Sequence, residues 1–245
     1  MRRSMFAALL VLACSAVARA ETLESFKKTI HAKVSAYKSL QYKTKVVSEI
    51  VNEQMTYKSN TEQTAQFVKQ GEKSLSHVET KTSSQTKMTG MDQKMEATSL
   101  DVCDGQYAYN YTDSSGQKTA TKRKVDPKKD ASPFDPMRGF KMSEEHFTMK
   151  MLPDETIDGK PVYVVEMTLK EQPQGMPMGA SRIYYDKGTG ISVKSVTLDD
   201  KGKPATTMTT TDIKIDANVP ADRFVFKAPE GVPVTDADAK QPAGE

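Results

Sequence analysis

The stretch SRIYYDKGTGISVKSVTLDDKGKPATTMTTTDIKI, from Ser181 to Ile215, decides the fold. It contains three short runs rich in residues that favour strands, and the segments between them hold Asp-Lys-Gly and Asp-Asp-Lys-Gly, which are typical of tight turns. The stretch therefore predicts three antiparallel strands in meander order. It contains no residue pattern typical of catalysis.

The same alternation extends through most of the chain. The first run with a period of two begins at Gln41; lysines fall on one of its faces, and the other face includes Tyr42, Thr44, Val46 and Ile50. Asp-Gly and Ser-Gly pairs mark hairpin turns between later runs. Together the runs predict about eleven strands in meander order. They are expected at 41–50, 56–69, 73–85, 94–103, 106–112, 117–124, 148–152, 161–170, 181–185, 191–198, 206–215 and 223–226.

Two segments favour helix instead. In the first, apolar residues recur at intervals of three and four and form one stripe, which predicts a helix lying over an apolar surface. The second, 132–147, contains two prolines and a glycine, so short helical pieces are expected there, one of them starting at Ser143. The apolar stripe of the first helix consists of Leu23, Phe26, Ile30, Val34 and Tyr37.

An antiparallel sheet of this size curls, and a naked apolar face would promote aggregation. We therefore expect a mainly β (α+β) fold, with a single antiparallel, strongly curved sheet that forms an unclosed β-barrel. The N-terminal helix and short lid helices would cover its apolar face. Composition does not divide 21–235, which predicts one domain, and 236–245 has the composition of a disordered tail.

The amino terminus has the layout of a secretory signal peptide. Arg2 and Arg3 precede an apolar run, and small residues at 18–20 predict cleavage between Ala20 and Glu21. This predicts a soluble periplasmic protein, which we expect to be a monomer. The alternative is a lipoprotein anchored in the outer membrane through a lipidated Cys14, because 11–14 loosely resembles a lipobox.

Charge and cysteine content exclude two further classes of protein. Removal of Arg2, Arg3 and Arg19 leaves 32 basic and 32 acidic side chains, so the mature chain gives no support for nucleic-acid binding. If Cys14 leaves with the leader, Cys103 is the one cysteine that remains, and no internal disulfide can form. The mature chain is therefore not a disulfide-stabilised scaffold.

The C-terminal half resembles the LolA-like superfamily of periplasmic lipoprotein carriers. The matching features are the aromatic pair and aspartate of Ile183–Asp186, the hairpin tip DKGK at 200–203, TDIK at 211–214, and ADRFVFKAPEGV at 221–232. DGKPVYVVEM at 158–167 and DVCDGQYAYNY at 101–111 are also similar to strand-turn-strand units of that family. The resemblance covers most of 22–235.

This resemblance implies an unclosed barrel wrapped around a helix, with a lid over an apolar cavity that holds acyl chains of a lipid or lipoprotein. It implies no cofactor and no catalysis. We also expect no metal site, and membrane-bound donor and acceptor proteins as possible partners. Family carriers place an arginine in an early strand. This chain has Lys43 and Lys45 there, on the charged face, so no residue role is transferred.

The candidate binding residues follow from the alternation and the lid segment. One phase of the first strand, together with an aromatic row opposite, is expected to face the cavity, and apolar residues of 132–147 are expected to form the lid. The same residues would equally fill the core of a solid barrel. The cavity set is Tyr42, Thr44, Val46, Ile50, Phe67, Tyr107 and Tyr109, with Tyr111 in the same row, and the lid set is Met137, Phe140, Met142 and Phe147.

An enzyme is not expected, because the chain has three histidines and neither a nucleophile elbow nor a glycine-rich phosphate loop. The fourteen methionines leave other readings open. Met88, Met91 and Met95, or Met149 with His146, are compatible with a periplasmic protein that binds Cu(I), whereas flexible thioethers also suit an adaptable apolar pocket. A further alternative is an envelope scaffold or stress-sensing protein without lipid cargo.

Overall fold

The computed structural model describes residues 21–51, 55–126, 130, 132–171 and 178–239. The expected leader, Cys14 included, lies outside the described residues, as do 240–245 of the expected tail. In chain order the elements are α1 (Leu23–Val34), β1 (Ser39–Val51), β2 (Met55–Gln70), β3 (Lys73–Met88), β4 (Met91–Cys103), β5 (Tyr107–Ser114), β6 (Gln117–Lys124), α2 (Pro136–His146), β7 (Phe147–Ile157), β8 (Lys160–Leu169), β9 (Met178–Asp186), β10 (Ser192–Asp199), β11 (Pro204–Ile215), the 3-10 helix η1 (Ala221–Phe224) and β12 (Val234–Asp236).

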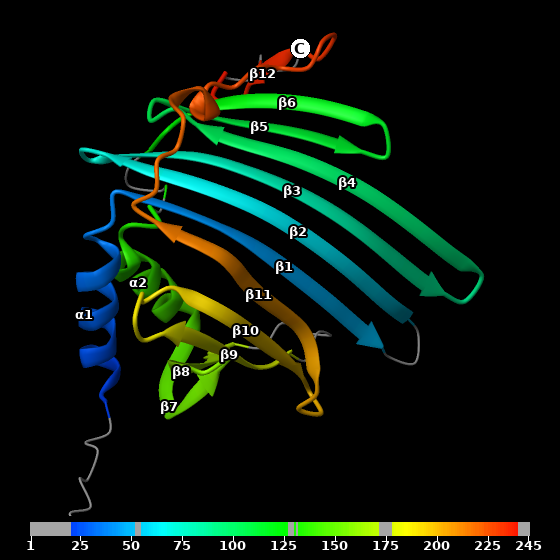
Figure 1. Ribbon diagram of the computed structural model, residues 1–245. Coiled ribbons are helices and arrows are strands. Elements are labelled where there is room, and N and C mark those ends of the chain that lie inside the picture. Colours follow the sequence, from blue (N-terminus) through cyan, green and yellow to red (C-terminus); the bar gives the residue numbers. More distant parts are fainter. Residues whose placement is uncertain (1–20, 52–54, 127–129, 131, 172–177, 240–245) are drawn as a thin grey trace, which may run out of the picture.

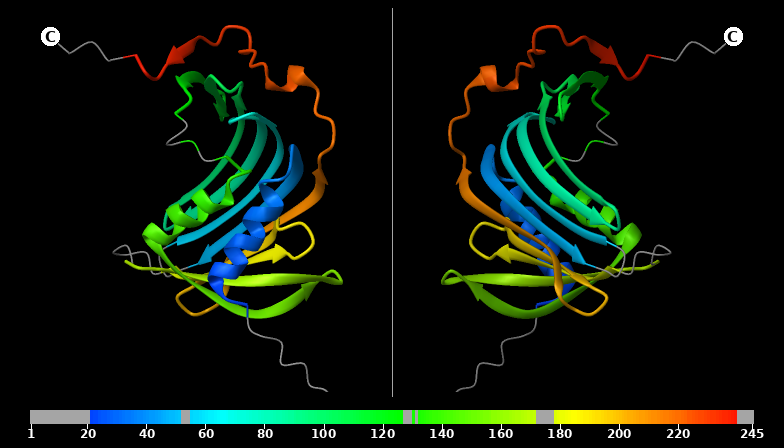
Figure 2. Two further views of the ribbon diagram at one scale, coloured as in Figure 1. Left: turned by 90° about the vertical axis from the view of Figure 1, so that its left-hand side faces the viewer. Right: turned by 90° about the vertical axis from the view of Figure 1, so that its right-hand side faces the viewer.

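The described strands form one twelve-stranded sheet in the order β12-β6-β5-β4-β3-β2-β1-β11-β10-β9-β8-β7. Consecutive strands are antiparallel neighbours within β1–β6 and within β7–β11, and β1 joins the two meanders by pairing with β11. The sheet curls around α1 and α2 without closing, since β7 and β12 remain at opposite edges (Figures 1 and 2). The predicted mainly β, unclosed and strongly curved sheet is confirmed.

The two faces of β1–β4 differ sharply in charge. Directly paired residues share a face, so the register assigns every side chain of these strands either to the inner face, which carries the helices, or to the outer face. On the inner face the charged residues of β1–β4 are Lys69 and Asp101. The outer face carries Lys43 and Lys45, both exposed as predicted, and most of the other lysines and glutamates of these strands.

A bulge in β11 corrects the phase of its side chains. Lys43 pairs with Thr211 and Gln41 with Lys214, so β11 has one residue more than β1 over this interval. Asp212 is that residue, with a φ of 53° that aspartate tolerates better than most side chains. The extra residue allows Thr210 and Ile213 both to face inward, although a regular strand would point them to opposite faces.

The main core lies between the helices and the sheet. Phe26 is fully buried, and its ring centroid lies 5.6, 5.4 and 5.1 Å from those of Phe140, Tyr163 and Tyr185. These contacts place the predicted apolar stripe of α1 against the inner face. No helix among the described residues is long and apolar enough to cross a membrane.

Two predictions about the local structure are wrong. α2 is one continuous helix that starts at Pro136, because Asp135 caps its first turn and Gly139 is accommodated inside it, so Ser143 starts nothing. The strand expected at 223–226 is absent: Phe224 ends η1, where it is buried. β12, a strand that the sequence did not indicate, pairs in parallel with β6 and ends at Asp236, next to the expected domain boundary at residue 235.

Candidate ligand cavity

An apolar hollow lies between the two helices and the middle of the sheet. Its volume is about 400 Å³, and its walls come from α1, α2, β1, β10 and β11. The α1 stripe reaches it because the helix runs along the inner face of the curled sheet (Figure 2). Its apolar lining includes Ile30, Val34, Leu40, Tyr42, Phe140 and Ile191.

A second and larger hollow of about 690 Å³ adjoins it under β2–β6. Its lining mixes apolar and polar groups. Phe67, Val102 and Phe134 are apolar, whereas Arg123 and Arg138 are charged. Volumes of this size fall within the range of about 300–1,000 Å³ that small-molecule sites occupy. Pro133 borders both hollows, so the segment before α2 forms the boundary between them.

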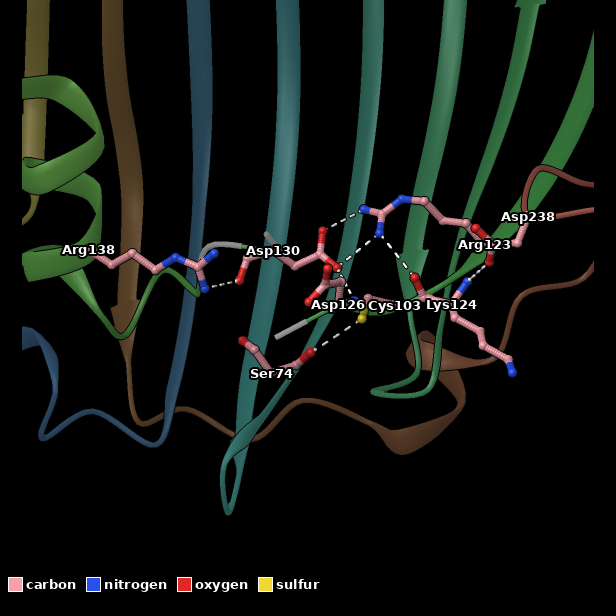
Figure 3. Close-up of polar contacts among 8 residues, drawn as sticks. All are labelled: Ser74, Cys103, Arg123, Lys124, Asp126, Asp130, Arg138 and Asp238. Atoms are coloured by element: carbon pink, nitrogen blue, oxygen red, sulfur yellow. Dashed lines mark hydrogen bonds and ion pairs between the residues drawn. The ribbon is translucent and has the colours of Figure 1, made fainter. Parts of the chain in front are cut away.

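A carboxylate between two arginines holds that segment in place. Arg123 of β6 donates to both carboxylate oxygens of Asp130, at 2.9 and 2.6 Å, and Arg138 of α2 donates to the Asp130 carbonyl at 3.0 Å. Figure 3 shows the two arginines reaching Asp130 from opposite sides. The hydrogen bonds from Arg123 lower the pKa of the Asp130 carboxyl below its ordinary value of 3.8, although partial burial opposes them.

Two polar atoms beside the larger hollow are buried and have no hydrogen-bond partner among the described residues. They are His31 Nδ1 of α1 and Ser74 Oγ of β3. Cys103 lines the same hollow, and its thiol lies 3.4 Å from the Ser74 carbonyl oxygen, which it can reach as a weak donor. Burial raises the pKa of the Cys103 thiol, so the thiol stays protonated at neutral pH and is a poor nucleophile.

The two helices are joined by an aromatic contact and by an ion pair. Phe26 of α1 packs on Phe140 of α2, and the buried Lys27 ammonium pairs with Glu144 of α2 and, at 2.9 Å, with Glu24. Burial lowers the pKa of Lys27, but the hydrogen bonds that its ammonium donates to the two carboxylates outweigh this effect, and the pKa ends above its ordinary value. α2 is therefore held at the mouth of the apolar hollow by α1.

Six of the predicted binding residues lie at or near these hollows. Tyr42 and Thr44 line the apolar hollow, Phe67 lines the larger one, and Phe140 projects from α2 into the apolar hollow. Phe147, just after α2, packs against the main core. Val46 lies on the same face as Thr44, opposite Met208 of the lining. Whether any of them binds a ligand stays a prediction.

The other five predicted residues do not face the apolar hollow. Tyr107 and Tyr109 are on the outer face, because Ala108 between them pairs with Cys103 of the inner face. There Tyr109 stacks on Phe226, at a centroid distance of 5.0 Å, beneath the C-terminal segment. Met137 and Met142 are exposed on α2, and Ile50 is exposed beyond the helices. Tyr109 is nevertheless among the residues that line the larger hollow, and Met137 and Met142 belong to α2, the expected lid. Tyr107 and Ile50 are the two that lie away from both hollows and from α2.

Few sequence features indicate the polar part of the site. Arg123 belongs to a basic run typical of a solvated loop, and its partner Asp130 lies in a segment without periodicity. Ile30 and Val34 were detectable, since the helical stripe predicts an apolar surface opposite them. Among the described residues, no group of three or more His, Cys, Asp and Glu side chains could hold a metal ion.

No family model matches the chain. An uncharacterized protein of Methanocaldococcus jannaschii is 31% identical over 143 residues, which are 57% of this chain and 38% of that protein. The chain thus spans well under half the length of this curated relative.

Several solved structures share part of the layout of this chain, at low TM-scores and low identity. They include LprF from Mycobacterium bovis (TM-score 0.38, 13% identity, 81% of this chain and 96% of that one) and a putative outer membrane lipoprotein-sorting protein domain from Vibrio parahaemolyticus (0.33, 10%, 81% and 94%). Another is MucB in the Pseudomonas aeruginosa MucA/MucB complex (0.39, 13%, 82% and 61%). At these scores the likeness carries no argument about function.

Proposed function

We propose that this protein is an exported, non-enzymatic carrier that holds the acyl chain of an amphiphilic lipid or lipoprotein under α2. The observation that carries the proposal is the adjacency of the two hollows, one apolar and one edged with charged and unpartnered polar groups, on either side of Pro133. An amphiphile presents the same two surfaces, an apolar chain and a polar head group.

The apolar hollow supplies the free energy of binding. Each methylene group that leaves water contributes about 0.8 kcal/mol, so a chain of several methylenes gives useful affinity without any specific polar contact. The lining of Ile30, Val34, Leu40 and Phe140 presents no charge that such a chain would have to desolvate. Entry needs a cover that opens, and we assign this role to α2, because its Phe140 and Ser143 line the hollow.

The larger hollow supplies the contacts for a head group. His31 Nδ1 and Ser74 Oγ have no partner among the described residues, and a ligand hydroxyl or ester would satisfy them. Arg123 and Arg138 are engaged with Asp130, so the net charge of the wall is small and a neutral or zwitterionic head group fits better than a polyanion.

The compartment and the partners follow from this activity. A carrier of lipid between membranes works in the periplasm and exchanges its cargo with membrane-bound donor and acceptor proteins. The protonated Cys103 thiol and the lack of any carboxylate pair in the apolar hollow favour binding over catalysis.

The test is native mass spectrometry of the protein purified from the periplasm. We expect adducts whose masses match acyl lipids in about one copy per chain, and we expect the delipidated protein to take up a fluorescent fatty acid. A protein that carries no lipid and binds no probe, yet cross-links to an envelope protein, would contradict the proposal and favour the scaffold or stress sensor.

A further inference from the structure

A row of methionines crosses the far end of the sheet, away from both hollows. Met55 of β2 pairs directly with Met88 of β3, and Met88 pairs directly with Met91 of β4. Figure 1 shows these strand ends extending well beyond the two helices. Directly paired residues point to the same face, so the three thioethers stand side by side on the inner face of the sheet.

The spacing of the row lets three sulfur atoms converge. Neighbouring strands lie about 4.8 Å apart, so Met55 and Met91 are separated by about 10 Å with Met88 midway between them. A methionine side chain has three rotatable bonds and no branch, so the outer two can lean towards the central one at little cost. Met88 and Met91 are both 45% exposed, which leaves the row open to an ion from solvent.

The surroundings select the kind of ion. The adjacent row on the same face is Tyr57, Thr86 and Gln93, which carry no charge. Lys87 and Asp92 belong to the opposite face, where they pair at 3.5 Å. Hard divalent ions prefer carboxylate and carbonyl oxygens, whereas neutral thioethers suit soft monovalent ions such as Cu(I).

The structure also changes which methionines belong together. The sequence grouped Met95 with Met88 and Met91, but Met95 pairs with Ser84, four residues or about 13 Å along β4 from Met91. His146 and Met149 lie at the β7 edge, and β8, β9, β10, β11 and β1 separate that edge from β2. Met55 takes the third position instead, which the sequence spacing did not indicate.

We propose that Met55, Met88 and Met91 form a three-thioether site for Cu(I) at this end of the sheet. The site is independent of the lipid cavity and adds a metal-binding activity that an exported protein can use in handling copper. Leucine matches methionine in volume and apolarity but lacks the sulfur, so leucine variants separate thioether chemistry from a merely apolar surface.

The experiment titrates Ag(I), a redox-inert probe for soft monovalent ions, into the full mature chain carrying Cys103→Ala, which removes the thiol that would compete for the ion. With methyl-13C methionine labelling, we expect three methyl resonances to shift together and to saturate at one equivalent. Met55→Leu, Met88→Leu and Met91→Leu in combination should abolish that equivalent.

The matched controls are Met95→Leu and the pair Met149→Leu with Met151→Leu, which should keep the bound equivalent. Native mass spectrometry with Cu(I) under ascorbate should give the same pattern of binding and loss. Absence of binding to the Cys103→Ala chain, or one equivalent that survives the triple leucine variant, would overturn the proposal. So would loss of binding in the Met149 and Met151 control with the row intact.

Discussion

The two halves of strand β1 differ in their surroundings: the helices cover the first half and leave the second uncovered. Thr44, a polar residue, is 7% exposed because α1 and α2 lie over it, whereas Ile50, an apolar residue six positions further on the same face, is 42% exposed. The helices, and not the strand sequence, therefore decide which part of the inner face becomes a cavity wall. The uncovered part carries the methionine row.

The largest difference between the two halves should appear in stability. Phe26→Ala removes the ring that packs on three other aromatic rings in the covered half, and we expect a loss of about 3–5 kcal/mol in the free energy of unfolding. Ile50→Ala in the uncovered half should cost less than about 0.5 kcal/mol. Urea denaturation measures both, and similar losses at the two positions would contradict the division.

The ion pair between the helices should contribute less than the aromatic contact. Glu144→Gln removes one of the two carboxylates that face the buried Lys27 ammonium, and we expect a destabilisation of about 1–2 kcal/mol. The matched control is Glu145→Gln, since that neighbouring side chain is exposed and should be neutral. Equal effects of the two changes, in urea at neutral pH, would show that Lys27 does not hold α2.

The contacts between Asp130 and its two arginines should stabilise the fold only above acidic pH. Its folded-state pKa lies below 3.8, so the carboxylate stabilises the fold above that pH, and this contribution disappears as pH falls through the lowered pKa. Asp130→Asn should therefore cost about 0.5–1 kcal/mol at pH 6 and less at pH ~3. Urea denaturation of both proteins at the two pH values measures this difference in stability. A difference that grows in acid would contradict the prediction.

The smallest effect is expected at the edge of the covered half. Val46 faces inward opposite Met208, whereas Val47 faces outward among charged residues. Val46→Glu should weaken binding of a fluorescent fatty acid by about fivefold, or about 1 kcal/mol, because the carboxylate is partly desolvated at the rim of the hollow. Val47→Glu should leave the affinity unchanged. Equal affinities of the two variants would show that Val46 does not lie at the rim of the hollow.

The fold could be predicted from the sequence because the alternation, the turn residues and the helical stripe all indicate the same architecture. Alternation set the strands, turn residues set the meander, and the stripe from Phe26 to Val34 placed a helix on the inner face. Alternation also assigned Tyr42 and Thr44 to the correct face, since a slip by one residue would bury Lys43 and Lys45.

The cavity could be predicted only in part because its limits are set by distant segments. Alternation alone cannot tell which face of β5 the helices cover, so the Tyr107 and Tyr109 rings were assigned to the wrong one. Nothing local indicates that residues after Ile215 cross the outer face and cover Tyr109 with Phe226. Asp130 and Arg123 likewise meet only after the chain has folded.

The central claim, a cavity that opens to an acyl chain, is tested most directly by filling it. Thr210 is buried in the wall of the apolar hollow, and its neighbour Thr209 on β11 is exposed on the outer face. We expect Thr210→Phe to abolish uptake of a fluorescent fatty acid by folded, delipidated protein, and Thr209→Phe to bind like the unmodified chain. Equal uptake by the two phenylalanine variants, both shown to be folded by circular dichroism, would contradict the account.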